Sequence, residues 1–321
     1  MRRSAHGKEK HGKEKSSTCC PVHPLCRNQH NNPYFFLFPL RNFGADAGCI
    51  PPHSTRFFGP AINRKSAHLF WIMSRLHLFA LSEKGLRDNN EDDLCAERIG
   101  DYHVLAVSDG LGGHECGEVA SGIAIGCLKN AVRFYEGDIR SLMRNAVFDA
   151  DEQILAVSEA SREKRGMATT LVAACVDDNL ACTVANIGDS RAHIISATDV
   201  KTTKDHSLVN QLLDAGEITP EEAWQHPMSM VLTRALGDPD SDIEPDFYEV
   251  NLEDTFLLLS SDGLHDFLPK ERIRAIVLAN KENVEKSARD LVREALLSGS
   301  DDNITVVLAY GETGPVPANG A

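Results

Sequence analysis

The sequence lacks an apolar run approaching the ~18 to 20 residues that a transmembrane helix requires. The 321-residue chain is therefore predicted to be soluble. It also lacks an excess of basic residues, because its formal net charge is -14. Such acidity argues against nucleic acid phosphates or an anionic membrane as the main partner. It favours a site for cations.

The nine cysteines lack the spacing of a disulfide framework, and an odd number cannot all pair with one another. Cys127, Cys175 and Cys182 fall within apolar helix or strand patterns, where a free thiol acts as a small hydrophobic group. No cysteine stands in a glycine-rich loop that ends in arginine, so the sequence offers no thiolate nucleophile of that type. The cysteines favour a reducing, cytoplasmic compartment.

Charge divides the chain near residue 72. Residues 1–72 hold 11 of the 33 Lys and Arg but 3 of the 47 Asp and Glu, a balance of +8, against -22 for the remaining 249 residues. The first segment contains the near-repeat HGKEKHGKEK and shows no sustained period, so it is predicted to be largely disordered. The folded domain is expected over residues 73–311, with a flexible tail at 312–321.

Three interpretations of residues 1–72 stay open. A targeting peptide is disfavoured because the apolar stretch at 34–40 is short and contains Pro39. A zinc module is disfavoured because adjacent cysteines do not give the usual ligand spacing, although possible ligands crowd together at Cys19, Cys20, His23, Cys26 and His30. The favoured hypothesis is a translation start at Met73, which peptides from upstream of that residue would contradict.

Hydrophobic periodicity predicts the main elements. Helices are expected at residues 115–135 and 139–161. Segments 167–176 and 180–187 suit an antiparallel hairpin around a polar turn. Further strands are predicted at residues 76–81, 102–107, 193–195, 255–261 and 304–310. The pattern of residues 205–237 predicts an irregular helical flap on the surface. Within it, Thr219 and Glu222 have the spacing of a capping box.

Acidic residues recur where the predicted strands end. Asp109 follows an apolar strand and precedes a turn whose glycines let a ligand approach main-chain carbonyls. The sequence SSDGL at 260–264 repeats the VSDGL pattern of 107–111. Other acids stand at 91–92, 302 and, as a candidate fifth site, Asp189. Acidic residues are also common in solvated loops. Their spacing alone therefore does not decide whether these acids form a site or only face solvent.

Acids gathered at one sheet edge would suit Mg²⁺ or Mn²⁺, which prefer oxygen ligands in octahedral geometry. Two such ions about 3.5 to 4 Å apart lower the pKa of a shared water and clamp a phosphoryl group for in-line attack. In this interpretation Asp109 bridges the ions, the Gly110 carbonyl serves the first, and Asp262 and Asp302 complete the second. Arg87, four residues before Glu91, offers a guanidinium that can hold phosphate through two hydrogen bonds.

Read in order, the motifs of the chain resemble those of the metal-dependent protein serine/threonine phosphatases, the PPM or type 2C family. The similarity covers about residues 74–310 and is of the stand-alone prokaryotic type. The motifs are GLRDNNED, SDGLGGHECGEVAS, GMATTL, ANIGDSRA, DHSLV with GEITPEEA, LTRALG, LLLSSDGLHD and SDDNITVV.

The resemblance implies an α+β fold, a four-layer αββα sandwich of two antiparallel β-sheets flanked by helices, with a dinuclear metal site at the sheet edge. It assigns Asp109 as the bridging ligand and Gly110 as the carbonyl ligand. Every other implied position carries the expected residue type: Asp262 and Asp302 as remaining ligands, Glu91 and Asp92 around metal-bound waters, Arg87 on the substrate phosphate, Asp189 on a third ion, and 205–237 as the flap.

The implied activity is hydrolysis of phosphoserine or phosphothreonine esters by metal-activated water, with two Mn²⁺ or Mg²⁺ ions and a weaker third. The implied partners are phosphorylated proteins, targets of a serine/threonine kinase, rather than nucleic acid or membrane. Two alternatives stay open: a catalytically silent phosphoprotein-binding regulator on the same fold, and a hydrolase of small phosphate esters.

One departure concerns the proton donor. Many eukaryotic relatives have histidine directly after the Asp-Gly pair, where this chain has Leu111, as prokaryotic relatives usually do. Metal-bound water is the first candidate donor, and His114 is a second.

Overall fold

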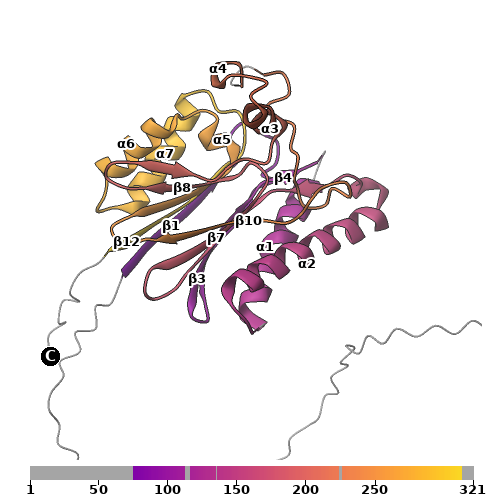
Figure 1. Cartoon of the computed structure of the whole chain (residues 1–321), viewed down its shortest axis with the longest axis horizontal. Helices are drawn as coiled ribbons and strands as arrows, with labels where there is room; N and C mark the ends of the chain where they lie inside the picture. The colour runs from indigo at the N-terminus through magenta and orange to yellow at the C-terminus, as the bar shows by residue number, and fades with distance from the viewer. Residues whose placement is uncertain (1–74, 113–115, 135, 224–225, 313–321) are drawn as a thin grey trace, which may run out of the picture. The chain divides into compact units, whose positions relative to one another are not determined.

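The computed structural model describes residues 75–112, 116–134, 136–223 and 226–312. The predictions for residues 1–72, for a start at Met73, for His114 and for residues 313–321 of the tail lie outside the described residues. Glu312, predicted as the first residue of the tail, is instead the last residue of a strand. Within them, two five-stranded sheets pack face to face with helices on their outer sides (Figure 1).

Every strand pair in both sheets is antiparallel. One sheet has the order β1-β12-β11-β8-β9, from β1 (Arg75–Glu83), β8 (Arg191–Ile195), β9 (Val200–Thr202), β11 (Phe256–Ser260) and β12 (Ile304–Glu312). The other has the order β10-β7-β6-β3-β2, from β2 (Asp93–Ile99), β3 (Tyr102–Ser108), β6 (Leu171–Val176), β7 (Ala181–Ile187) and β10 (Asp246–Asn251). A short ladder joins β4 (Gly110–Leu111) to β5 (Ala168–Thr169). The predicted hairpin is confirmed as β6 and β7.

Helices cover the outer face of each sheet (Figure 1). The β10-to-β2 sheet packs against α1 (Cys116–Phe134) and α2 (Ile139–Ala160), which confirms the two predicted helices. The β1-to-β9 sheet packs against α5 (Asp262–His265), α6 (Lys270–Ala279) and α7 (Val284–Leu297). A 3-10 turn, η1 (Arg162–Lys164), follows α2.

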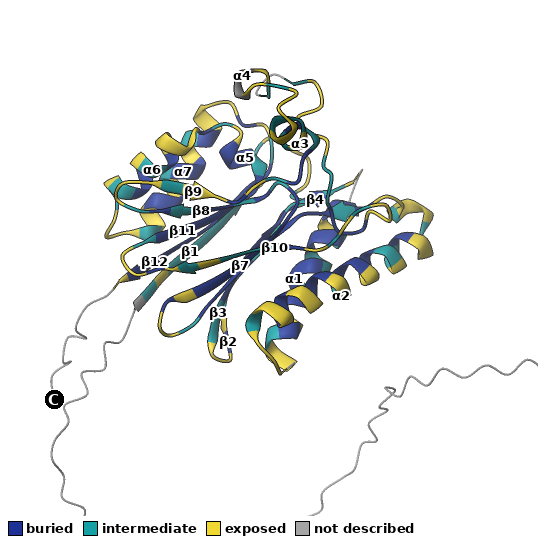
Figure 2. Cartoon of the chain, in the orientation of Figure 1, coloured by how far each residue is buried: buried dark blue, intermediate teal, exposed yellow. Residues whose placement is uncertain are grey.

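Alternation along the strands explains the four layers. Leu105 and Val107 of β3 face the core between the two sheets, while Val104 and Ala106 face α1 and α2. In β11 Leu257 points into the intersheet core. Successive side chains of a strand point to opposite faces, so a strand buried on both faces is apolar throughout. Figure 2 shows these strands as almost continuously buried, and the predicted sandwich is confirmed.

The segment 205–237 contains two short helices, α3 (Leu208–Ala215) and α4 (Pro220–Ala223), and its remaining described residues form turns and isolated bridges. It lies above the ends of the sheets in Figure 1. The capping box is confirmed, because the Thr219 N–H donates to Glu222 Oε2 at 2.8 Å and the Glu222 N–H donates to Thr219 Oγ1 at 3.3 Å. Among the described residues, none of the helices is both long and apolar enough to span a bilayer.

Candidate active site

Strand register places two of the predicted acids together. Asp93 at the start of β2 pairs with Ser108 at the end of β3. Asp92 and Asp109, one residue beyond this pair on each strand, therefore lie at the same end of the sheet. The prediction that Asp109 follows a buried strand is confirmed, because β3 ends at residue 108.

Three more acids, which come from the other sheet, lie at the same end of the sandwich as Asp92 and Asp109. Ser260, the last residue of β11, pairs with Val306 near the start of β12, so Asp262 and Asp302 lie beside each other. Ser260 also pairs with Arg191 at the start of β8, which Asp189 precedes. The acids come from both sheets because each sheet has strand ends at this edge.

A buried serine connects the two sheets at the site. Ser261 Oγ donates a hydrogen bond to Asp92 Oδ2 at 2.8 Å, and it accepts one from the Thr305 N–H at 2.9 Å. Asp92 directly precedes β2 of one sheet, whereas Ser261 directly follows β11 of the other sheet and Thr305 lies in β12 of that sheet. These two hydrogen bonds therefore hold the two sheets together where the acids lie.

Burial among like charges dominates the electrostatics. Burial raises the pKa of Asp109 well above its usual value, and Asp262, Asp92, Asp189 and Asp302 raise it further. The pKa of Asp262 is raised well above its usual value for the same two reasons, burial first. Burial also raises the pKa of Asp92 to about 6 and that of Asp189 to about 7. Five carboxyl groups from distant parts of the chain thus interact, and ionising all of them requires cations nearby.

The residues fit divalent cations. Among the described residues, Asp92 Oδ1 and Asp262 Oδ1 are buried and have no hydrogen-bond partner. A buried carboxylate oxygen without a partner is costly, and a cation would satisfy it. The donor set consists of oxygens alone, which suits Mg²⁺ or Mn²⁺.

The acids do not form a closed cage by themselves. No group of three or more His, Cys, Asp or Glu side chains in the described ranges is arranged to hold an ion unaided. Asp302 Oδ2 is turned instead to Arg87 Nη2 at 2.7 Å. An open arrangement agrees with the preference of Mg²⁺ for few carboxylates and several waters.

Asn303 holds the loop that carries Arg87, a role that the sequence did not suggest. Its Nδ2 donates to the Lys84 carbonyl at 2.8 Å and to the Asn89 carbonyl at 2.9 Å, and its Oδ1 accepts from the Glu91 N–H at 2.8 Å. The Arg87 side chain is 55% exposed, so the fixed loop presents its guanidinium to solvent at the edge of the acidic cluster. Burial raises the pKa of Glu91, which Arg87 opposes.

Two adjacent threonines fix the backbone of Asp109. Its carbonyl accepts from the Thr170 N–H at 2.9 Å and from Thr169 Oγ1 at 2.7 Å. Its N–H donates to Thr170 Oγ1 at 3.0 Å. Both threonines are fully buried, and the only sequence signal was two neighbouring hydroxyls in GMATTL.

Gly110 is needed because the backbone passes too close to α1 for a side chain. A Cβ at this position would lie 2.3 Å from the Gly117 carbonyl oxygen and 2.6 Å from that of Glu91. Gly110→Ala is expected to lower the free energy of unfolding by about 2 to 4 kcal/mol. Gly126→Ala is the matched control, since nothing lies within 4 Å of its Cβ. Urea denaturation compares them, and equal stability of the two variants would contradict the close approach.

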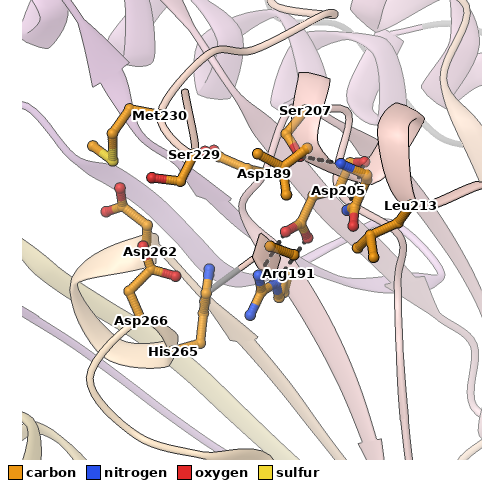
Figure 3. Close-up of a pocket in the computed structure, with 13 residues that line it drawn as sticks. Asp189, Arg191, Asp205, Ser207, Leu213, Ser229, Met230, Asp262, His265 and Asp266 are labelled. Atoms are coloured by element: carbon orange, nitrogen blue, oxygen red, sulfur yellow. Dashed lines mark hydrogen bonds and ion pairs between the residues drawn. The ribbon is translucent and has the colours of Figure 1, made fainter. Parts of the chain in front are cut away.

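A cavity of about 420 Å³ opens beside Asp189 and Asp262 (Figure 3). Arg191 and Asp205 form a bidentate pair on its wall, at 2.7 and 2.5 Å. Asp266, one turn after Asp262, also lines it, and burial raises its pKa. No role for Asp266 was predicted from the sequence, although the residue belongs to the motif LLLSSDGLHD.

The sequence of the chain is similar to those of known proteins. The sequence pattern described as Protein phosphatase 2C matches residues 81–304 of the chain. The chain belongs to the protein phosphatase 2C family. It is 34% identical to the serine/threonine phosphatase stp of Listeria welshimeri over 242 residues, 73% of this chain and 95% of that protein. It is 38% identical to the protein phosphatase PhpP of Streptococcus pneumoniae over 229 residues, 69% of this chain and 92% of that protein.

Solved phosphatase 2C relatives have the same fold. The serine/threonine phosphatase PstP of Mycobacterium tuberculosis superposes with a TM-score of 0.66 at 36% identity, covering 73% of this chain and 98% of that chain. The catalytic domain of PstP in complex with two manganese ions gives a TM-score of 0.66 at 34% identity, covering 74% and 99%. As a phosphatase 2C protein, the chain is a metal-dependent protein serine/threonine phosphatase.

Proposed function

We propose that this phosphatase 2C protein hydrolyses phosphoserine and phosphothreonine esters of proteins at the edge where Asp109, Asp262, Asp92, Asp189 and Asp302 meet. The observation that carries the proposal is the convergence of these acids around two buried carboxylate oxygens that lack partners. Such a cluster is unfavourable without cations, and a phosphoryl-transfer site needs them.

In the proposed assignment Asp109 would bind both of two Mn²⁺ or Mg²⁺ ions, the Gly110 carbonyl would bind the first, and Asp262 and Asp302 would bind the second. Glu91 and Asp92 would hold water around them. Bound divalent ions supply a water of lowered pKa and neutralise the charge that develops on the phosphoryl group. Asp189 would hold a third ion, and its position on the cavity wall next to Asp262 supports this.

Arg87 is proposed to bind the substrate phosphate. Its guanidinium reaches Asp302 Oδ2 from an exposed position, so a phosphate placed over the acids comes within its reach. A planar guanidinium donates two parallel hydrogen bonds to phosphate oxygens, which orients the ester for attack.

Arg87→Ala is expected to raise the KM for a phosphothreonine peptide about 10- to 100-fold and to change kcat less, because ground-state binding of the phosphate is lost. Arg98→Ala is the matched control: Arg98 is also exposed and paired with an acid, Asp178, but it lies near the far end of β2. Steady-state kinetics separates the two constants. A fall in kcat with KM unchanged would contradict the role of Arg87.

The proton for the leaving alkoxide is assigned to water. Leu111 cannot supply it. Of the histidines in the described segments, His265 lines the cavity beside Asp262, but burial holds its pKa well below the usual value. It is therefore neutral and a poor acid at physiological pH.

Phosphorylated proteins are the proposed substrates, and a serine/threonine kinase is the class of enzyme that must supply them. A cytoplasmic location is proposed because the cysteines of the described part, Cys95, Cys116, Cys127, Cys175 and Cys182, are all free and buried. A phosphothreonine peptide and para-nitrophenyl phosphate, each assayed with Mn²⁺, test the proposal. A silent regulator would hydrolyse neither, and a small-ester hydrolase would hydrolyse only the second.

A further inference from the structure

A second cavity, of about 350 Å³, adjoins the proposed active site, and Arg191 does not line it. Asp189 and Asp262 line both this cavity and the one in Figure 3, and Met230 contributes to both. A group that enters the second cavity therefore lies directly beside the acids proposed to act on phosphate.

The second cavity differs from the first in the chemistry of its lining. Leu111, Ala168, Met230, Leu232 and Pro239 present apolar surface to it. The first cavity has the Arg191–Asp205 ion pair and Asp266 instead. An aliphatic group is favoured in the second cavity by its release from water.

The walls of the apolar cavity are built before anything binds. Leu111 pairs with Ala168 in the β4-β5 ladder. Thr169 and Leu236 exchange two backbone hydrogen bonds of 2.9 Å, which attach the 232–237 stretch to that ladder. The Gly237 N–H then donates to the buried Asp151 Oδ1 at 2.8 Å. A rigid apolar pocket loses little entropy on binding.

Met230 closes one side of this cavity and is 68% exposed. Figure 3 shows its side chain directed toward the Asp262 carboxylate. A large apolar side chain held in solvent beside acidic groups is positioned to be covered by a ligand. Methionine adapts to different apolar partners because its side chain is unbranched and polarisable.

We infer that the apolar cavity binds the aliphatic side chain of the residue next to the phosphorylated serine or threonine. The inference rests on the proposed function. Residues of an extended peptide follow one another at about 3.3 Å, so a phosphate over Asp262 brings a neighbouring side chain within reach of a cavity that Asp262 itself lines. Asp238, which is assigned to no cation, also lines the cavity, and its charge opposes an acidic neighbour. The enzyme selects phosphorylated sites flanked by leucine, isoleucine, valine or methionine.

Phosphothreonine peptides that carry leucine, glycine or aspartate on either side of the phosphothreonine test this selection. The kcat/KM for leucine on one of the two sides is expected to exceed that for glycine about tenfold, mainly through KM, with aspartate poorest. Met230→Ser and Leu232→Asn are each expected to bring the leucine-to-glycine ratio near one. The ratio is normalised to hydrolysis of para-nitrophenyl phosphate by the same preparation.

Met228→Ser is the matched control, because Met228 is 46% exposed on the same segment and does not line the cavity. It should keep the full leucine preference. The inference is overturned if wild-type enzyme hydrolyses all peptides with similar kcat/KM, or if the preference survives in both cavity variants. Failure of every peptide to be hydrolysed would instead refute the proposed function.

Discussion

Asp109→Ala is expected to lower kcat for a phosphothreonine peptide by about 10³-fold or more, since the variant loses the carboxylate proposed to bridge both ions. Burial, and then the charges of the other acids with Asp262 first among them, raises the pKa of Asp109. Its removal should also weaken metal binding, measured by calorimetric titration with Mn²⁺. Asp101→Ala is the control, because Asp101 is exposed in the turn between β2 and β3, at the other end of the sheet.

The fold should survive this change. Burial, and after it the charges of the neighbouring acids, raises the pKa of Asp109, so its ionised carboxylate destabilises the metal-free protein. Metal-free Asp109→Ala is therefore expected to melt at the same temperature as the metal-free wild type or above it. Retention of more than a tenth of wild-type turnover by a folded variant would exclude the bridging role.

Removing divalent cations with a chelator is expected to abolish hydrolysis, and adding Mn²⁺ or Mg²⁺ to restore it. Cations should also raise the melting temperature, because they bind the folded state alone. The effect should depend on pH. Folded-state pKa values of about 6 for Asp92 and about 7 for Asp189 lie above the ordinary 3.8. The contribution of these two groups to the stability of the metal-free protein is thus fully present below about pH 4 and is lost as pH rises through 6 to 7.

The rise in melting temperature caused by saturating Mn²⁺ should consequently be larger at pH 8 than at pH 5. Differential scanning fluorimetry across this range, with and without chelator, measures it. Asp189→Asn should reduce the pH dependence, since one of the titrating groups of the cluster is removed. Full activity in the presence of chelator would contradict the assignment of these acids to cations.

The sequence predicted those strands and helices that have a strong local hydrophobic pattern. Apolar strands such as β3 and β11 stand out because both faces are buried, and helices α1 and α2 carry regular stripes. The sequence pattern did not predict β2, β10, α6 or α7. β10 lies at the edge of its sheet and mixes exposed with half-buried residues, so its hydrophobic pattern is weak.

The residues of the site also fall into those that local sequence patterns predict and those that they do not. Asp109, Asp262 and Asp302 could be singled out because each accompanies a strand end, and the structure gathers them. The supporting contacts of Asn303, Thr169 and Thr170 could not be predicted, because they join segments that are far apart in sequence. Strand order decides such contacts, and periodicity carries no information about it. The sequence also could not show that Arg87 reaches Asp302.

Crystals grown with Mn²⁺ and measured for anomalous scattering test the central claim most directly. We predict two strong peaks about 3.5 to 4 Å apart at the shared end of the two sheets, both in contact with Asp109 and one also with Asp262 and Asp302. A single peak, or the absence of two peaks in contact with Asp109, would contradict the account.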